Sequence, residues 1–405
     1  MHAIAVYSDI DSDSLHVKRA DESFYLGGSL PADSYRNLKN LIKAVVETKA
    51  DMVHPGYGFL AENADFAKAV QKKDVIWIGP NPETIKSMGD KIESRKLISK
   101  VGLMPVPGQL KPSRTKREAL KDANSFGYPV ALKAAHGGGG KGLRIVSNEK
   151  ELNENFEIVK RESEAYFGSD QIYVEKFIKP ARHVETQILS DKYGNHVYLG
   201  ERDCSIQRRN QKVIERAPAP YLKGNQRQVV CEMATKICKH VGYECAGTVE
   251  FLMDIDTEEF FFIEVNPRIQ VEHTITEEVT GIDIVRAQIM LSEGANLNEA
   301  IGKKNQSDIV CNGHAIQCRI TTEDPLNNFI PDYGRITAYR GATGMGIRLD
   351  GGTAYSGAII TRFYDSLLEK VTAWAPTPKD AISRMDRALR AVSYTHLTLP
   401  TKRIV

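Results

Sequence analysis

The sequence lacks the features that would place it in a membrane, on nucleic acid or in a secretory pathway. No apolar stretch among the 405 residues approaches the roughly 18 residues that a membrane-spanning helix needs. The N-terminus has no basic stretch followed by an apolar core, so no signal peptide is expected. The net charge is only +2, which gives no reason to expect a nucleic acid or a membrane surface as partner. We therefore expect a cytoplasmic protein that binds neither.

Cysteine is scarce, and its spacing excludes two common kinds of site. The chain has six cysteines, which are Cys204, Cys231, Cys238, Cys245, Cys311 and Cys318. They contain no Cys-x-x-Cys pair and no spacing typical of zinc ligands or of a disulfide framework. Internal repeats and low-complexity segments are also absent. What remains is an ordinary globular composition, 41% hydrophobic and 26% charged, in a chain long enough for two or three domains.

Apolar strands alternate with helical periodicities in the first part of the chain. Residues 35–48 have the apolar spacing of a helix, and strands are expected at 3–7, 51–54 and 75–78. This alternation predicts an α/β fold with a doubly wound parallel sheet at the N-terminus. The later chain predicts other elements. They are a break at 105–108, strands at 129–134 and 143–146, mixed structure from 170 to 290, a polar linker near 305–308, and a β-rich region followed by a helix at about 378–390.

Residues 263–274 place many polar groups directly after the apolar run 260–263. If the strand continues through them, side chains at alternate positions share one face: Glu264, Asn266, Arg268, Gln270 and Glu272. Such a face suits a core poorly, because buried charges must be paired or bound to a metal. Carboxylate oxygens at this spacing suit Mg²⁺. The alternative is a solvated edge strand with surface ion pairs.

Three other features carry chemistry. The glycine run 137–140 lies between two expected strands, where glycine amides can approach a phosphate, although a plain flexible turn explains the run equally well. Lys133 follows an apolar run and is expected inside a sheet, with phosphate as its natural partner. Glu250 lies in the expected strand 248–252. Glu250 and Glu264, if they lie on adjacent strands, repel each other unless a cation lies between them.

Four segments, in order along the chain, resemble the signatures of biotin carboxylases, which are ATP-grasp enzymes. They are Met88-Gly-Asp-Lys91, the run from Lys133 to Gly142, Glu201-Arg-Asp-Cys-Ser-Ile-Gln-Arg-Arg209 and Asn266-Pro-Arg-Ile-Gln-Val-Glu-His-Thr274. Segments 319–325, 344–350 and 364–368 look most like the biotin carboxylase part of pyruvate carboxylases. Biotin carboxylases of acetyl-CoA and propionyl-CoA carboxylases are close alternatives.

The resemblance implies an α+β ATP-grasp architecture in three domains. An N-terminal, pre-ATP-grasp domain is expected at 1–88, without the first strand and helix of the family. An ATP-grasp domain follows at 89–300 with a mobile lid at about 107–180, and then a β-rich C-terminal domain at 308–390. Residues 391–405 do not resemble the family, and we expect them to be a non-native tail.

The resemblance also assigns roles to residues. ATP would be bound by Lys91, Lys133, Gly139, Gly140, Glu175, Lys176, Ile178, His183, Gln207 and Asn210. Two Mg²⁺ or Mn²⁺ ions would be bound by Glu250, Glu264 and Asn266. Bicarbonate would lie against Lys212, Arg268, Gln270 and the backbone of Val271. Structural alternatives remain for Glu175 (a surface strand end) and His183 (a surface histidine), and Asn210 stands where many family members have histidine.

In the implied reaction Glu272 deprotonates bicarbonate, and Arg319 stabilises the ureido oxygen of biotin, so Arg268, Glu272, Lys212 and Arg319 form the catalytic set. The expected function is a ligase that carboxylates biotin through carboxyphosphate. Expected partners are a biotin carboxyl carrier domain, a carboxyltransferase domain and a second copy of the chain. There are two alternatives. The chain could be another ATP-grasp ligase, one that makes an acyl phosphate, or it could be an inactive fragment. The sequence leaves the final acyl acceptor and control by acetyl-CoA open.

Overall fold

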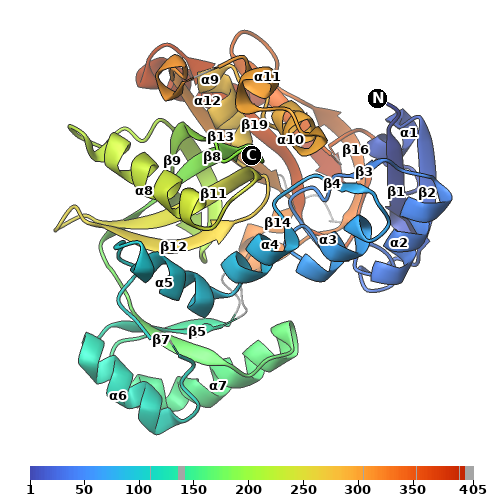
Figure 1. Ribbon diagram of the computed structural model, residues 1–405. Coiled ribbons are helices and arrows are strands. Elements are labelled where there is room, and N and C mark those ends of the chain that lie inside the picture. Colours follow the sequence, from blue (N-terminus) through green and yellow to red (C-terminus); the bar gives the residue numbers. More distant parts are fainter. Residues whose placement is uncertain (110, 136–141, 304, 353, 392, 397–405) are drawn as a thin grey trace. The chain divides into compact units, whose positions relative to one another are not determined.

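The computed structural model describes residues 1–109, 111–135, 142–303, 305–352, 354–391 and 393–396. They form two compact units (Figure 1). Unit 1 contains Met1–Ile78, Thr274–Gly281 and the described residues from Val310 onward; unit 2 contains Gly79–His273 and Ile282–Ile309. Among these residues, no helix has both the length and the apolar character that crossing a membrane requires.

The N-terminal part of unit 1 contains short parallel strands and helices. β1 (Ile4–Ser8) pairs with β2 (Glu22–Gly27), and β3 (Met52–Val53) pairs with β4 (Ile76–Trp77). The expected strands and the expected helix, α2 (Leu38–Glu47), are present, but the strands form two separate parallel pairs where one sheet was expected. The remaining helices here are α1 (Leu15–Arg19) and α3 (Ala64–Gln71).

The C-terminal part of unit 1 is β-rich, as expected. β13 (His314–Thr321), β19 (Leu367–Ala375) and β17 (Ile347–Gly351) pair in antiparallel order, and α12 (Pro378–Ala391) packs against β19. Three further strands, β18 (Ile359–Ile360), β16 (Gly334–Arg340) and β20 (Ser393–His396), pair in that order, while β14 (Glu323–Asp324) pairs with β15 (Ile330–Pro331). α9 (His273–Thr280) begins in unit 2 and continues into unit 1.

An aromatic cluster joins the two ends of the chain within unit 1. The rings of Tyr35, Phe59 and Tyr364 lie 5.1–5.8 Å apart, centre to centre. The hydroxyl of Tyr364 also donates to Ser8 Oγ at 2.6 Å. Aromatic pairs at such distances stabilise a fold beyond their buried area. This cluster explains why segments more than 300 residues apart belong to one unit.

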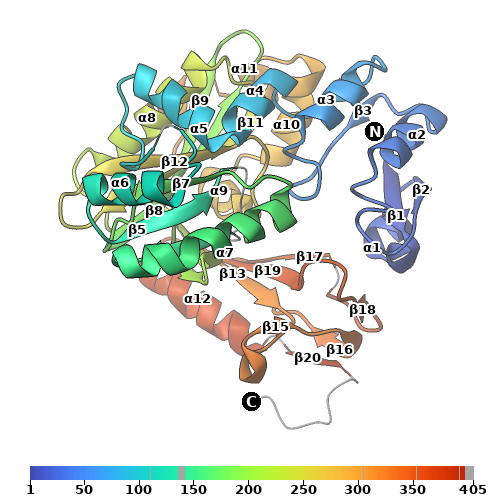
Figure 2. The same ribbon diagram turned by 90° about the horizontal axis from the view of Figure 1, so that it is seen from below.

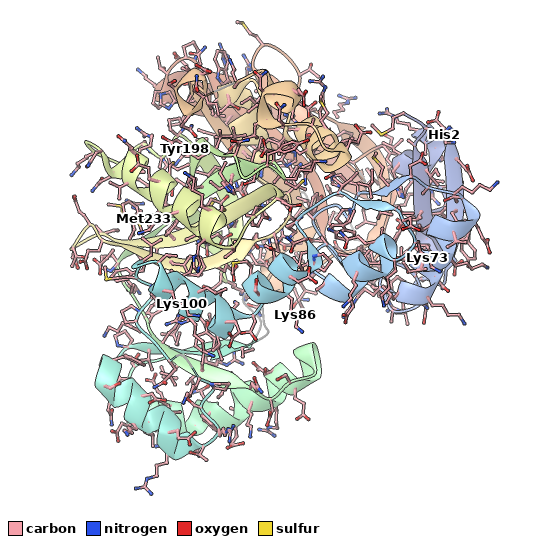
Figure 3. The ribbon with its side chains drawn as sticks, viewed as in Figure 1. His2, Lys73, Lys86, Lys100, Tyr198 and Met233 are labelled. Carbon is pink, nitrogen blue, oxygen red and sulfur yellow. The ribbon has the colours of Figure 1, made fainter. Side chains whose placement is uncertain are left out.

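Unit 2 is built on an antiparallel sheet in the order β12 (Phe260–Asn266), β11 (Cys245–Asp254), β8 (Ala181–Ser190), β9 (His196–Arg208) and β10 (Gln211–Ala217). α8 (Gln226–His240), α4 (Pro82–Gly89) and α5 (Lys91–Lys100) contribute to one core with this sheet. Met233 on α8 and Tyr198 on β9, both labelled in Figure 3, pack at the edge of that core. A second core joins sheet residues to α10 (Ile284–Glu293) and α11 (Leu297–Ile301).

A smaller sheet lies within the segment expected to be the lid. β6 (Leu143–Val146), β5 (Val130–Ala134) and β7 (Ile172–Lys176) pair in that order, antiparallel. Two helices, α6 (Lys116–Phe126) and α7 (Glu149–Phe167), share its apolar core, and Figure 2 shows them against this sheet. The two strands expected to flank the glycine run are thus present, whereas residues 136–141 lie outside the described part of the chain.

Candidate active site

Four charged side chains form a continuous row across the sheet of unit 2. Glu264 on β12 lies opposite Glu250 on β11, which lies opposite Glu185 on β8, which lies opposite Arg202 on β9. Residues directly opposite each other in a sheet project from the same face. The row therefore places three carboxylates next to one another. Because like charges this close repel, the arrangement requires cations beside them.

Lys212 supplies one of these cations from β10. Its Nζ lies 2.6 Å from Glu185 Oε2, 2.7 Å from Glu250 Oε1 and 2.7 Å from Glu272 Oε1. Burial disfavours the charged amine, but the three carboxylates hold the pKa of Lys212 well above its usual value. The side chain is therefore a permanent cation at neutral pH, next to the fully buried Glu272.

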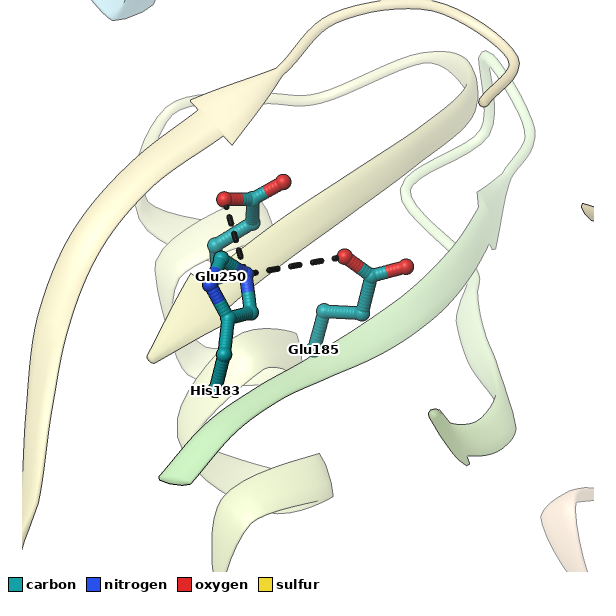
Figure 4. Close-up of side chains that lie close together, drawn as sticks. All are labelled: His183, Glu185 and Glu250. Atoms are coloured by element: carbon teal, nitrogen blue, oxygen red, sulfur yellow. Dashed lines mark ion pairs between the residues drawn. The ribbon is translucent and has the colours of Figure 1, made fainter. Parts of the chain in front are cut away.

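Glu250 lies at the centre of the cluster. Its Oε2 is 3.0 Å from His183 Nε2, and its Oε1 accepts hydrogen bonds from Asn266 Nδ2 at 2.9 Å and from Gln270 Nε2 at 3.2 Å. Burial opposes its ionisation, yet Lys212 and His183 hold the pKa of Glu250 well below its usual range. Figure 4 shows the His183 ring between Glu250 and Glu185. The carboxylate is thus charged and surrounded by donors.

The expected alternation of side chains along 264–272 is wrong beyond Asn266. β12 ends there because Pro267 has no N–H to donate to a neighbouring strand. The residues nevertheless converge from the loop that follows. Gln270 reaches Glu250, Glu272 reaches Lys212, and Arg268 Nη2 donates to Asn266 Oδ1 at 3.1 Å.

Two lysines expected at phosphate lie beside carboxylates. Lys91 is the first residue of α5, whose N-terminus is capped by Asp90, and its Nζ lies 3.2 Å from Glu264 Oε2. Burial lowers the pKa of Lys91, but the carboxylates of Glu264, Glu175 and Glu250 together more than offset this and raise it. Lys133, on β5, forms an ion pair with Glu175 on β7.

Arg95 also reaches this carboxylate, with its Nη1 3.1 Å from Glu175 Oε2. Sequence reasoning missed this arginine, although its position four residues after Lys91 on a helix was a usable signal.

The remaining predicted nucleotide contacts divide into two groups. Gln207 Nε2 and His183 Nδ1 lie 3.1 Å apart, so these two residues form one pair. Lys176 turns its amine to the carbonyl oxygen of Gly127 at 2.8 Å, and Ile178 is buried in a separate apolar cluster. Gly139 and Gly140 lie outside the described residues.

Asn210, where many family members have histidine, lies in the two-residue turn between β9 and β10. Its φ is +62°, and that of Arg209 is +51°. A tight hairpin turn of this kind needs positive φ at both central residues, and asparagine adopts it more readily than most side chains. The backbone of this turn therefore accommodates asparagine at position 210.

Arg319 belongs to unit 1, on β13, directly opposite Lys370 on β19. The Lys370 Nζ lies 6.0 Å from the centre of the Tyr57 ring. Burial and the nearby Asp365 raise the pKa of Tyr57, and the positive charge of Arg319 opposes this shift. Arg319, Lys370 and Tyr57 therefore form a local cationic cluster with a phenol. Sequence reasoning did not find Tyr57 or Lys370, since they come from segments more than 300 residues apart.

The donor set around Glu250 fits a hard divalent cation. Glu250 and Glu264 offer carboxylate oxygens from directly opposed positions, and Asn266, two residues after Glu264 on β12, adds an amide oxygen. Mg²⁺ favours one or two carboxylates together with phosphate oxygens. Ligand atoms of His183, Glu185 and Glu250 also lie within 4.8 Å of one another. The residues predicted to bind metal are thus brought together by the fold.

Comparison with family models matches nearly the whole chain. Residues 1–85 match "Biotin carboxylase, N-terminal domain" and residues 317–398 match "Biotin carboxylase C-terminal domain". Residues 90–300 match "Carbamoyl-phosphate synthase L chain, ATP binding domain". The C-terminal match extends into residues 391–405, which were expected to be unlike the family.

Curated relatives and solved structures agree with these matches. The chain is 46% identical to pyruvate carboxylase of Bacillus subtilis over 392 residues and 49% identical to mitochondrial pyruvate carboxylase of Mus musculus over 390 residues. Each alignment covers 96% of this chain but only 34% and 33% of the relative, so the chain spans about a third of their length.

Among solved structures, the chain is similar to the biotin carboxylase domain dimer of Hydrogenobacter thermophilus 2-oxoglutarate carboxylase, which was solved in complex with MgADP, ADP and bicarbonate. The TM-score is 0.93 and the sequence identity is 43%, and the match covers 97% of this chain and 85% of that one. Rhizobium etli pyruvate carboxylase, with the allosteric activator acetyl coenzyme A, has a TM-score of 0.92 and 54% identity, over 96% of this chain and 35% of that one.

Proposed function

Because this chain belongs to the biotin carboxylase family, whose members are ATP-dependent ligases, we propose that it carboxylates the biotin of a carrier domain with ATP and bicarbonate. One observation carries the proposal. A charged, partly buried amine, Lys212, lies 2.7 Å from a fully buried carboxylate, Glu272, beside a donor set suited to a divalent cation. A small anion and a general base need this combination of charges in one place.

Bicarbonate would bind where positive charge and amide donors meet. Lys212 and Arg268 supply the charge, and Gln270 with the backbone of Val271 supplies further contacts. Glu272 then removes the proton of bicarbonate, a role that requires hydrogen-bond reach and an ionised carboxylate. Its contact with Lys212 favours that ionised form.

The nucleotide would bind along the same face of unit 2. Lys91 and Lys133 would contact phosphate oxygens, and Glu175, Lys176, Ile178, His183, Gln207 and Asn210 would contact adenine and ribose. Glu250, Glu264 and Asn266 would hold two Mg²⁺ or Mn²⁺ ions, which neutralise phosphate charge when bound. The roles of Gly139 and Gly140 stay predictions.

These residues support an order of bond changes. A bicarbonate oxygen attacks the γ-phosphorus of ATP, the bond to the β-phosphate oxygen breaks, and carboxyphosphate and ADP result. Carboxyphosphate then releases CO₂ and phosphate. The released phosphate accepts the proton of the ureido nitrogen of biotin, and this nitrogen attacks CO₂ to form the new N–C bond, while Arg319 stabilises the negative charge on the ureido oxygen.

We further propose that the chain is the biotin-carboxylating part of a pyruvate carboxylase. The curated relatives described above support this finer assignment, and the acetyl-CoA and propionyl-CoA carboxylases are its alternatives. Its partners would then be biotin carboxyl carrier and carboxyltransferase domains and a second copy of the chain. The three-domain division, the origin of residues 391–405 and the cytoplasmic location stay predictions.

The test is phosphate release from the purified chain with MgATP and bicarbonate, with and without free biotin. The parent chain should release phosphate faster with biotin, and Glu272→Gln should lose that release. Glu201→Gln is the matched control, because Glu201 is also a buried carboxylate of this sheet but contacts Arg227 and not Lys212. Release that does not respond to biotin would instead favour another ATP-grasp ligase, a possibility that the match to a carbamoyl-phosphate synthase domain raises.

A further inference from the structure

We propose that Arg202 is a positioning residue for bicarbonate: it holds Glu185, and through Glu185 it fixes the amine of Lys212. This inference rests on the function proposed above and adds two residues to which no role has been assigned. Both side chains are wholly buried, with 0% exposure. A buried guanidinium and a buried carboxylate are costly unless paired, so their presence calls for an explanation.

The guanidinium of Arg202 is fixed by three side chains from two strands. Its Nε donates to Glu185 Oε1, its Nη1 donates to Gln187 Oε1 at 2.8 Å, and its Nη2 donates to Thr248 Oγ1 at 3.0 Å. Glu185 and Gln187 lie on β8, and Thr248 lies on β11. A planar fork with contacts in three directions has little freedom to rotate. Arg202 therefore presents a rigid charge to Glu185.

Glu185 divides its two oxygens between two cations. Oε1 accepts from Arg202, while Oε2 lies 2.6 Å from Lys212 Nζ. The carboxylate thus links the rigid guanidinium to an amine on a long, flexible stem. Lys212 in turn lies 2.7 Å from Glu272. The contacts run from Arg202 to the base through three links: Arg202 to Glu185, Glu185 to Lys212, and Lys212 to Glu272, which follows the end of β12.

Arg202 also affects how strongly the positive charge of Lys212 can attract a ligand. Glu185 lies directly opposite Glu250 in the sheet, so two carboxylates compete for the same amine. Arg202 offsets the charge of Glu185 and leaves Lys212 less neutralised. Burial opposes the charged state of Arg202, but Glu185 and Glu272 keep the pKa of its guanidinium above its ordinary value. The charge of Arg202 therefore acts at the proposed bicarbonate site as well as on Glu185.

A second Arg–Glu pair on the same strand provides a matched control. Glu201 directly precedes Arg202 on β9, so its side chain projects from the opposite face. Arg227 Nε lies 2.8 Å from Glu201 Oε1, and Glu201 Oε1 also accepts from the backbone N–H of Ala219. This pair has the same chemistry but borders the α8 side of the sheet. Its loss should affect folding without moving Lys212.

The experiment compares the double variant Arg202→Met/Glu185→Gln with the control Arg227→Met/Glu201→Gln. Each removes one charge of either sign, so no unpaired buried charge remains. Initial rates of phosphate release are measured against bicarbonate at saturating MgATP, and against MgATP at saturating bicarbonate. We expect the first variant to raise the KM for bicarbonate at least tenfold, as loss of a charge-assisted contact predicts, with a KM for ATP within threefold of the parent. The control should change the bicarbonate KM less than twofold.

An unchanged bicarbonate KM in the first variant, or an equal rise in the control, would overturn the inference. If circular dichroism shows that the double variant does not fold, Arg202→Lys decides. Lysine keeps the charge but lacks the fork, so it should raise the bicarbonate KM at least threefold, and no rise would reject the positioning role. A parent chain without biotin-stimulated, bicarbonate-dependent release would overturn the proposed function and this inference with it. An active parent with unaffected variants would overturn the inference alone.

Discussion

Replacement of Lys212 by methionine should destabilise unit 2 strongly. The substitution keeps an unbranched side chain, shortens it by one heavy atom and removes its charge. The amine lies 2.6–2.7 Å from three carboxylates, those of Glu185, Glu250 and Glu272. After the change these carboxylates are left with one cation fewer in a buried site. The fold must then tolerate their mutual repulsion or protonate them.

The size of the effect follows from these contacts. Each contact at about 2.7 Å is worth roughly 6 kcal/mol of attraction at an effective dielectric constant of about 20, before the cost of removing the charges from water. That cost cancels much of the attraction. Removing one partner of a buried ion pair typically costs about 3–5 kcal/mol. We therefore expect Lys212→Met to lower the free energy of unfolding by about 3–5 kcal/mol at pH 8.

The penalty should depend on pH with a definite sign. Without Lys212, the pKa values of the buried carboxyl groups rise in the folded state above their value in the unfolded chain. A group of this kind binds more protons when folded, so stability falls as pH rises. The difference between Lys212→Met and the parent should therefore be largest at pH 8 and should shrink as the pH falls towards 5.

The assay must report on unit 2. Both tryptophans, Trp77 and Trp374, belong to unit 1, so their fluorescence follows the other unit. Urea unfolding by circular dichroism, together with hydrogen exchange of peptides from β8 to β11, reports on the sheet that carries Lys212. Lys223→Met is the control, because the Lys223 side chain is 80% exposed and lies 3.7 Å from Glu258. Such surface pairs contribute about 0–1 kcal/mol. A Lys212→Met penalty no larger than that of the control would refute the reasoning.

Three further predictions concern other parts of the molecule. Burial, with a smaller contribution from Lys239, lowers the pKa of His196 in the folded chain below 6.5. The unfolded chain therefore binds this proton more readily, so the stability that neutral His196 contributes is complete above pH 6.5 and is lost as the pH falls below it. His196→Gln should therefore lose less thermal stability than the parent between pH 7.5 and 5.5, and equal losses would contradict this assignment. Arg319→Met should reduce the stimulation of phosphate release by biotin at least tenfold and leave the biotin-independent rate within threefold; unchanged stimulation would exclude a role in binding biotin. Phe251→Ala should lower the free energy of unfolding by about 3–5 kcal/mol in urea titrations, because Phe251 is fully buried against Phe262, whereas a loss under 1 kcal/mol would mean that the core closes around the cavity.

The pattern of apolar residues along the sequence predicted these strands at nearly the right positions, because each is a short apolar run with clear ends. The expected strands at 129–134 and 143–146 correspond to β5 and β6, and the run at 260–263 begins β12. The extension of that strand through residue 272 was wrong, because Pro267 ends the pairing. The residues that the pattern singled out still come together, but from the loop after the strand and not along one strand face.

Glu185 and Arg202 show what sequence reasoning missed at the site. Each lies in a stretch with other charged residues, and no local feature distinguishes Arg202 from its neighbours Glu201 and Asp203. Glu185 follows His183 at the spacing of one strand face, which was a usable signal. Nothing local, however, indicates that Glu185 lies opposite both Glu250 and Arg202. Pairing between strands depends on register, and register is a property of the assembled sheet.

The sequence by itself determined the family, the order of its motifs and the chemical types that converge: lysines, carboxylates and amides. These follow from residue identity along the chain. The tertiary structure alone decided that Glu264, Glu250, Glu185 and Arg202 stand in one row, and that a single amine from β10 serves three carboxylates. The physical reason is that charge interactions fall off over a few ångströms, and only the folded sheet fixes distances of that size between residues far apart in sequence.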